Sequence, residues 1–125
     1  MSENEISQSI VSLAFKVHST LGPGLLESVY EAALSYELRK AGFYVDNQRG
    51  LPVNYQGEVL SLGFRTDIIV NEKVIIEIKS IEQLADIHYK QLLTYLRLSG
   101  MKLGILANFN SASLKGSIRR VVNGL

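Results

Sequence analysis

The sequence predicts an α/β fold in which helices pack on a β-sheet. Apolar residues recur at helical spacing in the first third of the chain, and apolar and polar residues alternate after residue 43. A later helical segment is then followed by a short apolar strand. Because the 125 residues contain no internal repeat and no linker, we expect a single domain over residues 1–125.

Two helices are expected at the N-terminal end. The first covers Ile6–Leu21, where apolar residues fall on one helical face, and Gly22-Pro23-Gly24 ends it because proline cannot extend a helix. The second runs from about Leu25 to Ala41 and finishes with basic residues followed by Gly42, which is a common C-terminal signature.

The rest of the chain is expected to be mainly strands. Four strands are predicted before the third helix: Phe43–Gln48, Val53–Tyr55, Val59–Val70 and Val74–Lys79. Turns are expected near Gln56-Gly57 and over Asn71–Lys73. The third helix is predicted over Gln83–Ser99, and it is followed by a buried strand at Leu103–Phe109 and an edge strand at Ser117–Val122.

The composition excludes several classes of protein. With 46% hydrophobic and 20% charged residues, the chain is neither disordered nor a fibre nor a coiled-coil rod. The lack of cysteine excludes disulfide scaffolds, thiolate zinc sites and cysteine nucleophiles, and two histidines are too few for a three-histidine metal site. The apolar runs are short and the N-terminus is acidic, so we expect no membrane span, no secretory signal and a cytoplasmic protein.

The charges are distributed unevenly along the chain. Residues 1–86 carry 7 basic and 12 acidic side chains, whereas residues 87–125 carry 6 basic and none that are acidic. The six are Lys90, Arg97, Lys102, Lys115, Arg119 and Arg120. Such a segment is typical of a site for a polyanion. The alternative is that acidic and basic segments intermix in the fold and cancel.

The segment from Arg65 to Lys79 is the most informative. Its even-numbered positions from residue 68 to residue 78 are apolar and predict one core face, with acidic and basic residues on the other. If a three-residue loop joins the two strands, Asp67 lies opposite Glu77 on the same face, with Lys79 beside them. A two-residue loop would place the two carboxylates on opposite faces, so the interpretation depends on the register.

Two adjacent carboxylates repel each other unless a cation compensates them, and Mg²⁺ prefers such oxygen ligands. With Lys79 nearby to stabilise negative charge, the set has the parts needed for metal-assisted hydrolysis of a phosphate ester. The alternative is a solvated strand face with ordinary ion pairs. Other polar residues share helical faces, but Glu27 also suits a first helical turn, and His88, Gln91 and Tyr95 also fit the polar flank of an amphipathic helix.

Several motifs together resemble a known family. Gly24-Leu-Leu-Glu27-Ser-Val-Tyr30 matches the G-x-x-E-x-x-Y motif that names the GxxExxY proteins, which resemble a branch of the PD-(D/E)XK nuclease superfamily. The other matching segments are Val17-His18, Leu21–Gly24, Asp67, Glu77-Ile-Lys79, Gln91–Tyr95 and Asn108-Phe109-Asn110. One departure is Thr66, where the superfamily often has proline. The resemblance implies a restriction-endonuclease-like core, a mixed sheet flanked by helices in α-β-β-β-α-β order.

The resemblance also implies roles for individual residues. Asp67 and Glu77 would hold Mg²⁺, or Mn²⁺ in its place, with help from the Ile78 carbonyl. Lys79 would position or activate the attacking water and stabilise the pentavalent phosphorane.

Two further residues would complete the catalytic set. Glu27 would complete a second-metal or water position, and Gln91 would orient Lys79 or the water. Three residues are expected to support the site: Tyr30, Tyr95 and His88.

The function predicted in this way is a metal-dependent nuclease, with DNA as the expected substrate. The residues expected to contact nucleic acid are Arg97, Lys115, Arg119 and Arg120. Specificity would come from a partner, from homodimerisation or from nucleic-acid shape, because so short a chain leaves no room for a separate reading domain. The alternatives are a non-catalytic module on the same fold, which binds nucleic acid or protein, and a hydrolase of another phosphate ester.

Overall fold

The computed structural model describes the backbone of all 125 residues and every side chain except that of Leu62. The elements are α1 (Glu3–Leu21), α2 (Glu27–Lys40), β1 (Val45–Tyr55), β2 (Glu58–Val70), β3 (Val74–Lys79), α3 (Asp86–Ser99), β4 (Leu103–Asn108) and β5 (Ile118–Val122). The strands form one sheet in the order β1-β2-β3-β4-β5, antiparallel except for the parallel pair β3 and β4. The α/β prediction is confirmed, and β5 lies at the edge as expected.

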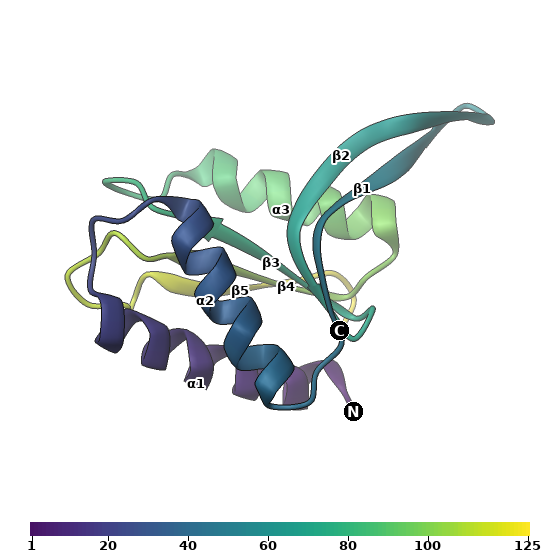
Figure 1. Cartoon of the computed structure of the whole chain (residues 1–125). Coiled ribbons are helices and arrows are strands. Elements are labelled where there is room, and N and C mark those ends of the chain that lie inside the picture. The colour runs from purple at the N-terminus through teal and green to yellow at the C-terminus, as the bar shows by residue number, and fades with distance from the viewer.

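The helices cover both faces of this sheet (Figure 1). Side chains of α1 and α2 pack with Ile68, Ile76 and Ile105, whereas those of α3 pack with Ile75 and Leu106 on the opposite face. The predicted alternation of even and odd positions in β2 and β3 is therefore correct. None of the helices in the described part of the chain is long and apolar enough to cross a membrane.

Two of the three helices, α1 and α3, begin where a side chain satisfies a free backbone group, whereas Leu26 at the start of α2 has no such cap. α1 gains a turn over its prediction because Ser2 and Glu5 form a reciprocal capping box. α3 begins at Asp86 and not at Gln83, and the Nδ1 atom of His88 accepts the N–H of Ala85 just before it. The segment expected to be the first turn of α3 is thus a loop.

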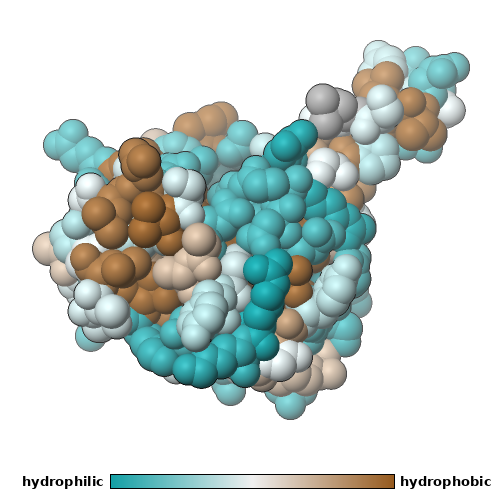
Figure 2. All heavy atoms as spheres, viewed as in Figure 1, coloured by the Kyte–Doolittle hydropathy of each residue, from teal (hydrophilic) through white to brown (hydrophobic). Residues whose placement is uncertain are grey.

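Strand β1 is one long strand where two short ones were expected. Pro52 interrupts the sequence pattern but not the strand, because the β1–β2 register shifts between Leu51 and Val53 and no ladder hydrogen bond is needed from proline there. Beyond this point β1 and β2 form a ribbon that projects from the body (Figure 1). Exposed apolar side chains, including Val59 and Leu60, lie near its end (Figure 2).

Strands β1 and β2 also change their packing partner along their length. Asn47 in β1 contacts α2, whereas Leu51 packs with the cluster under α3 and Phe64 stacks on Tyr95 of α3 at 4.4 Å between ring centroids. The two strands therefore bend between these positions, so that they pack against α2 near Asn47 and against α3 near Leu51 and Phe64.

Candidate functional site

The predicted register between β2 and β3 is confirmed. Val70 pairs with Val74 across a three-residue turn, and the ladder runs to Ile68 and Ile76. Beyond the pair Ile68 and Ile76, side-chain carboxylates accept the backbone N–H groups in place of carbonyls. The Asp67 N–H donates to Oε2 of Glu77 at 3.3 Å, and the Ile78 N–H donates to Oδ2 of Asp67 at 2.8 Å. The two carboxylates replace the missing ladder bonds and are brought together on one face.

Glu77 is only 6% exposed. Burial raises its pKa to about 9, and the hydrogen bond to Asp67 and the charge of Asp67 act in the same direction. The N–H of Asp67 and the ammonium of Lys79 act against this rise in pKa, but their effects are smaller. Without a bound cation, Glu77 therefore carries a proton at neutral pH.

A third acidic residue, Glu31, lies near Asp67 and was not predicted as a site residue from the sequence. The Nε2 atom of Gln48 donates to Oε1 of Glu31 at 2.6 Å and to Oδ1 of Asp67 at 3.3 Å. Burial raises the pKa of Glu31, and the charge of Asp67 contributes to this rise. Glu31 lies four residues after Glu27, so the helical spacing was a signal that both acids share a face.

The predicted catalytic residue Glu27 lies beside the end of β3. Its Oε2 atom accepts the N–H of Ser80 at 3.1 Å, immediately after Lys79. The buried side chain of Asn108 in β4 binds the N–H and the C=O of Ile81 at 3.1 and 3.0 Å. Glu27 and Asn108 thus hold the two residues that follow Lys79, where the chain leaves the sheet.

The predicted supporting residue Tyr30 does not reach the carboxylates. Its hydroxyl donates to the Gly22 carbonyl at 2.6 Å and accepts the Leu25 N–H at 3.1 Å. The Leu25 carbonyl in turn accepts from the Ser80 hydroxyl at 2.6 Å. Tyr30 therefore secures the loop before α2, and that loop contacts the residue after Lys79.

Helix α3 brings one of its three predicted residues close to the carboxylates. Tyr95 is half-buried, and its pKa is raised by burial and by the charges of Glu77 and Asp67. Gln91 is exposed one turn earlier in α3. The side chain of His88 binds the Ala85 N–H at the start of α3 and takes no part in the site.

The basic C-terminal residues do not form one surface. Arg119 pairs with Leu106, which pairs with Glu77, so Arg119 lies in the same row and on the same face as Glu77. Arg120 points to the opposite face, where it donates to Asn4 of α1. The two arginines therefore lie on opposite faces of the sheet, because neighbouring residues of a strand point to opposite faces.

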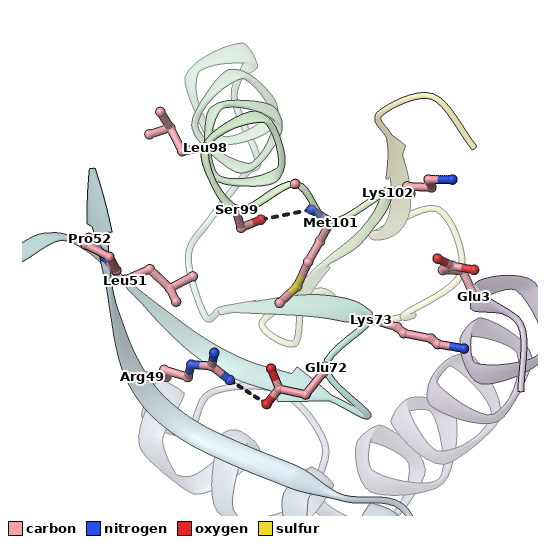
Figure 3. A pocket seen from close by; sticks show the side chains of 11 residues that line it. Glu3, Arg49, Leu51, Pro52, Glu72, Lys73, Leu98, Ser99, Met101 and Lys102 are labelled. Atoms are coloured by element: carbon pink, nitrogen blue, oxygen red, sulfur yellow. Dashed lines mark hydrogen bonds and ion pairs between the residues drawn. The ribbon is translucent and has the colours of Figure 1, made fainter. Parts of the chain in front are cut away.

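The described side chains contain no group of three or more His, Asp or Glu residues placed to hold one ion. Asp67 and Glu77 thus supply two carboxylates, and backbone or water oxygens would have to complete the coordination of an ion. A separate pocket of about 460 Å³ lies at the opposite end of β3, where Arg49 and Glu72 form an ion pair beside the end of α3 (Figure 3). It does not include the carboxylate pair.

Comparisons with known proteins concern the fold and the family. The crystal structure of SSO0001 is similar to 98% of this chain, with a TM-score of 0.57 and 25% sequence identity, and the match covers 60% of that chain. No protein with curated annotation matches the sequence. The family profile described as the PD-(D/E)XK nuclease superfamily matches residues 4–121. The chain therefore belongs to the PD-(D/E)XK nuclease superfamily.

Proposed function

We propose that this protein is a metal-dependent nuclease that hydrolyses phosphodiester bonds, with DNA as its substrate. The observation that carries the proposal is the pair formed by the buried Glu77 and the partly buried Asp67, with Lys79 next to it at the end of β3. Membership of a nuclease superfamily supports the same reaction class. Within the superfamily, the Gly24–Tyr30 motif supports the GxxExxY branch.

A hard divalent cation fits this pair. Mg²⁺ and Mn²⁺ take carboxylate, carbonyl and water oxygens, and a cation offsets the burial and the charge of Asp67, which together raise the pKa of Glu77. Asp67 and Glu77 would hold the ion, together with the Ile78 carbonyl. When bound, it would supply Lewis-acid stabilisation of charge on the phosphate.

The remaining residues supply position and charge. Lys79 ends β3 beside the pair, where its ammonium stabilises negative charge on the phosphate and orients the attacking water. Glu27 places a carboxylate on the N–H of Ser80, immediately after Lys79, and is suited to hold that water or a second ion. Gln91 is proposed to orient Lys79 or the water from α3.

Arg119 is the best-placed contact for the nucleic-acid backbone. It lies two strands from Glu77 on the same face, which corresponds to about 10 Å. Lys115 precedes it in the β4–β5 loop and Arg97 lies in the last turn of α3, and both are exposed. Phosphate contacts of this kind supply affinity without reading sequence.

The deciding experiment is cleavage of a panel of single- and double-stranded DNA and RNA with Mg²⁺ or Mn²⁺. We expect cleavage by the wild type, loss of cleavage in Lys79→Ala, and retained cleavage in Lys73→Ala, which removes an exposed lysine near the other end of β3. Binding of nucleic acid and Mn²⁺ without cleavage of any substrate would identify a non-catalytic module instead. Cleavage of a small phosphodiester alone would identify a hydrolase of another phosphate ester.

A further inference from the structure

Gln48 has an unusual backbone conformation in the middle of β1. Its φ is 52°, although the neighbouring pairs Asn47 with Ile68 and Arg49 with Thr66 keep one register. Residues with side chains rarely adopt positive φ, and glutamine lacks the short side chain that makes this conformation easier for asparagine and aspartate. Such outliers persist only where their surroundings impose them, and they gather at functional sites.

The conformation directs the Gln48 side chain to the carboxylates. Its Nε2 atom donates to Asp67 at Oδ1, while the Ile78 N–H binds Oδ2 of the same carboxylate. Each oxygen of Asp67 thus accepts one hydrogen bond. A carboxylate oxygen can accept a second interaction, so both remain able to bind a cation.

Gln48 is itself anchored from α2. Glu31 accepts from Gln48 at 2.6 Å through Oε1 and from Asn47 at 3.1 Å through Oε2. Asn47 also donates to Ser35 at 2.8 Å and accepts from Arg39 at 2.6 Å. Glu31, Ser35 and Arg39 lie at four-residue intervals on α2, so one helical stripe holds this part of β1.

We propose that Gln48 is a positioning residue that orients Asp67 for metal binding and connects it to α2 through Glu31. This inference rests on the proposed function, because it assigns a metal-binding role to Asp67. Residues that hydrogen-bond to metal ligands typically change metal affinity by about 10- to 100-fold when they are removed. Gln48 therefore acts on the reaction through Asp67 and does not contact the substrate.

A purely structural role is the competing explanation, because β1 bends near Gln48. Substitution of Gln48 by glycine distinguishes the positioning role from the structural role. Glycine adopts positive φ freely and so keeps the bend, but it removes the side-chain amide. The chain offers a matched control in Gln56, an exposed glutamine with φ of 49° at the β1–β2 turn. Gln48→Gly and Gln56→Gly relieve the same backbone strain, but only the first removes a contact to Asp67.

The test compares the wild type, Gln48→Gly and Gln56→Gly by Mn²⁺ titration calorimetry, with thermal unfolding as the check on folding. We expect the Kd for Mn²⁺ to rise about 10- to 100-fold in Gln48→Gly alone, while neither variant unfolds at a lower temperature. Cleavage by Gln48→Gly should recover at saturating Mn²⁺. In the metal-free protein, the Ile78 amide proton should shift upfield and exchange faster in NMR spectra of Gln48→Gly only.

Two results would overturn the inference in distinguishable ways. If Gln48→Gly matched the wild type in Mn²⁺ affinity and in the Ile78 amide signal, while Asp67→Asn lost Mn²⁺ binding, Gln48 would be structural and the metal site would stand. If the wild type bound no Mn²⁺ even at pH 9, the proposed function itself would fail and the positioning role would fall with it.

Discussion

Asp67 and Glu77 close the end of the β2–β3 ladder with their side chains: Glu77 accepts the N–H of Asp67, and Asp67 accepts the N–H of Ile78. Two acids that would otherwise repel each other are thus each bound to a backbone donor of the neighbouring strand. The arrangement stabilises the sheet end only while one of the two holds a proton or a cation lies between them. Stability and metal binding should therefore depend on the same proton.

The metal-free protein should lose stability as the pH rises from about 4.5 to about 9. In this range the folded state keeps the Glu77 proton that the unfolded chain, with the ordinary pKa of 4.5, has already released. Stability then falls by up to about 1.4 kcal/mol per pH unit. Thermal unfolding is measured across this pH range with a chelator present. The fall in stability with pH should be smaller in Glu77→Gln and unchanged in Glu82→Gln, because Glu82 is exposed. A wild-type curve that is flat over this range would contradict the buried proton.

Mn²⁺ binding should displace the same proton, so its affinity should rise with pH up to about 9. Calorimetry in two buffers of different ionisation enthalpy is expected to detect about one proton released per ion at pH 7. Glu77→Ala should lose Mn²⁺ binding, because the ion would keep only one of its two carboxylate ligands. Unchanged Mn²⁺ binding in this variant would exclude Glu77 as a principal ligand.

Tyr30→Phe should destabilise the protein although it removes a single oxygen atom. The Gly22 carbonyl and the Leu25 N–H would both lose their partner in a partly buried position, at a cost of about 1–3 kcal/mol. Urea unfolding measures this loss. Tyr36→Phe is the control, since Tyr36 is 62% exposed and should change stability little. Equal effects of the two substitutions would mean that the Tyr30 hydroxyl does not secure the loop.

Arg119→Ala and Arg120→Ala should differ in DNA binding. Removal of Arg119, on the Glu77 face, should weaken binding and reduce the salt slope by about 1 for one lost phosphate contact. Arg120→Ala should leave binding nearly unchanged because that side chain contacts α1. Both should retain turnover of a small chromogenic phosphodiester. If Arg120→Ala weakened DNA binding as much as Arg119→Ala, the assignment of nucleic acid to the α3 face would be wrong.

The sequence by itself determined the order of helices and strands, apart from the division of β1 into two, together with the core face of β2 and β3 and the placement of Asp67 beside Glu77. These features are local: periodicity sorts side chains by face, and a three-residue turn sets the register of the strands that it joins. Element ends were less predictable, because the start of α3 is secured by His88 and the preceding loop by Asn108 in β4.

Only the tertiary structure decided which distant residues meet the carboxylates. Glu31 and Gln48 carry no local signal of a contact with Asp67, since that contact requires a positive φ in β1 and the docking of α2 against it. The separation of Arg119 from Arg120 likewise follows from the pairing of β5 with β4, which assigns each residue of the strand to one face. Contacts between segments far apart in sequence depend on how whole elements pack, and no short pattern encodes that packing.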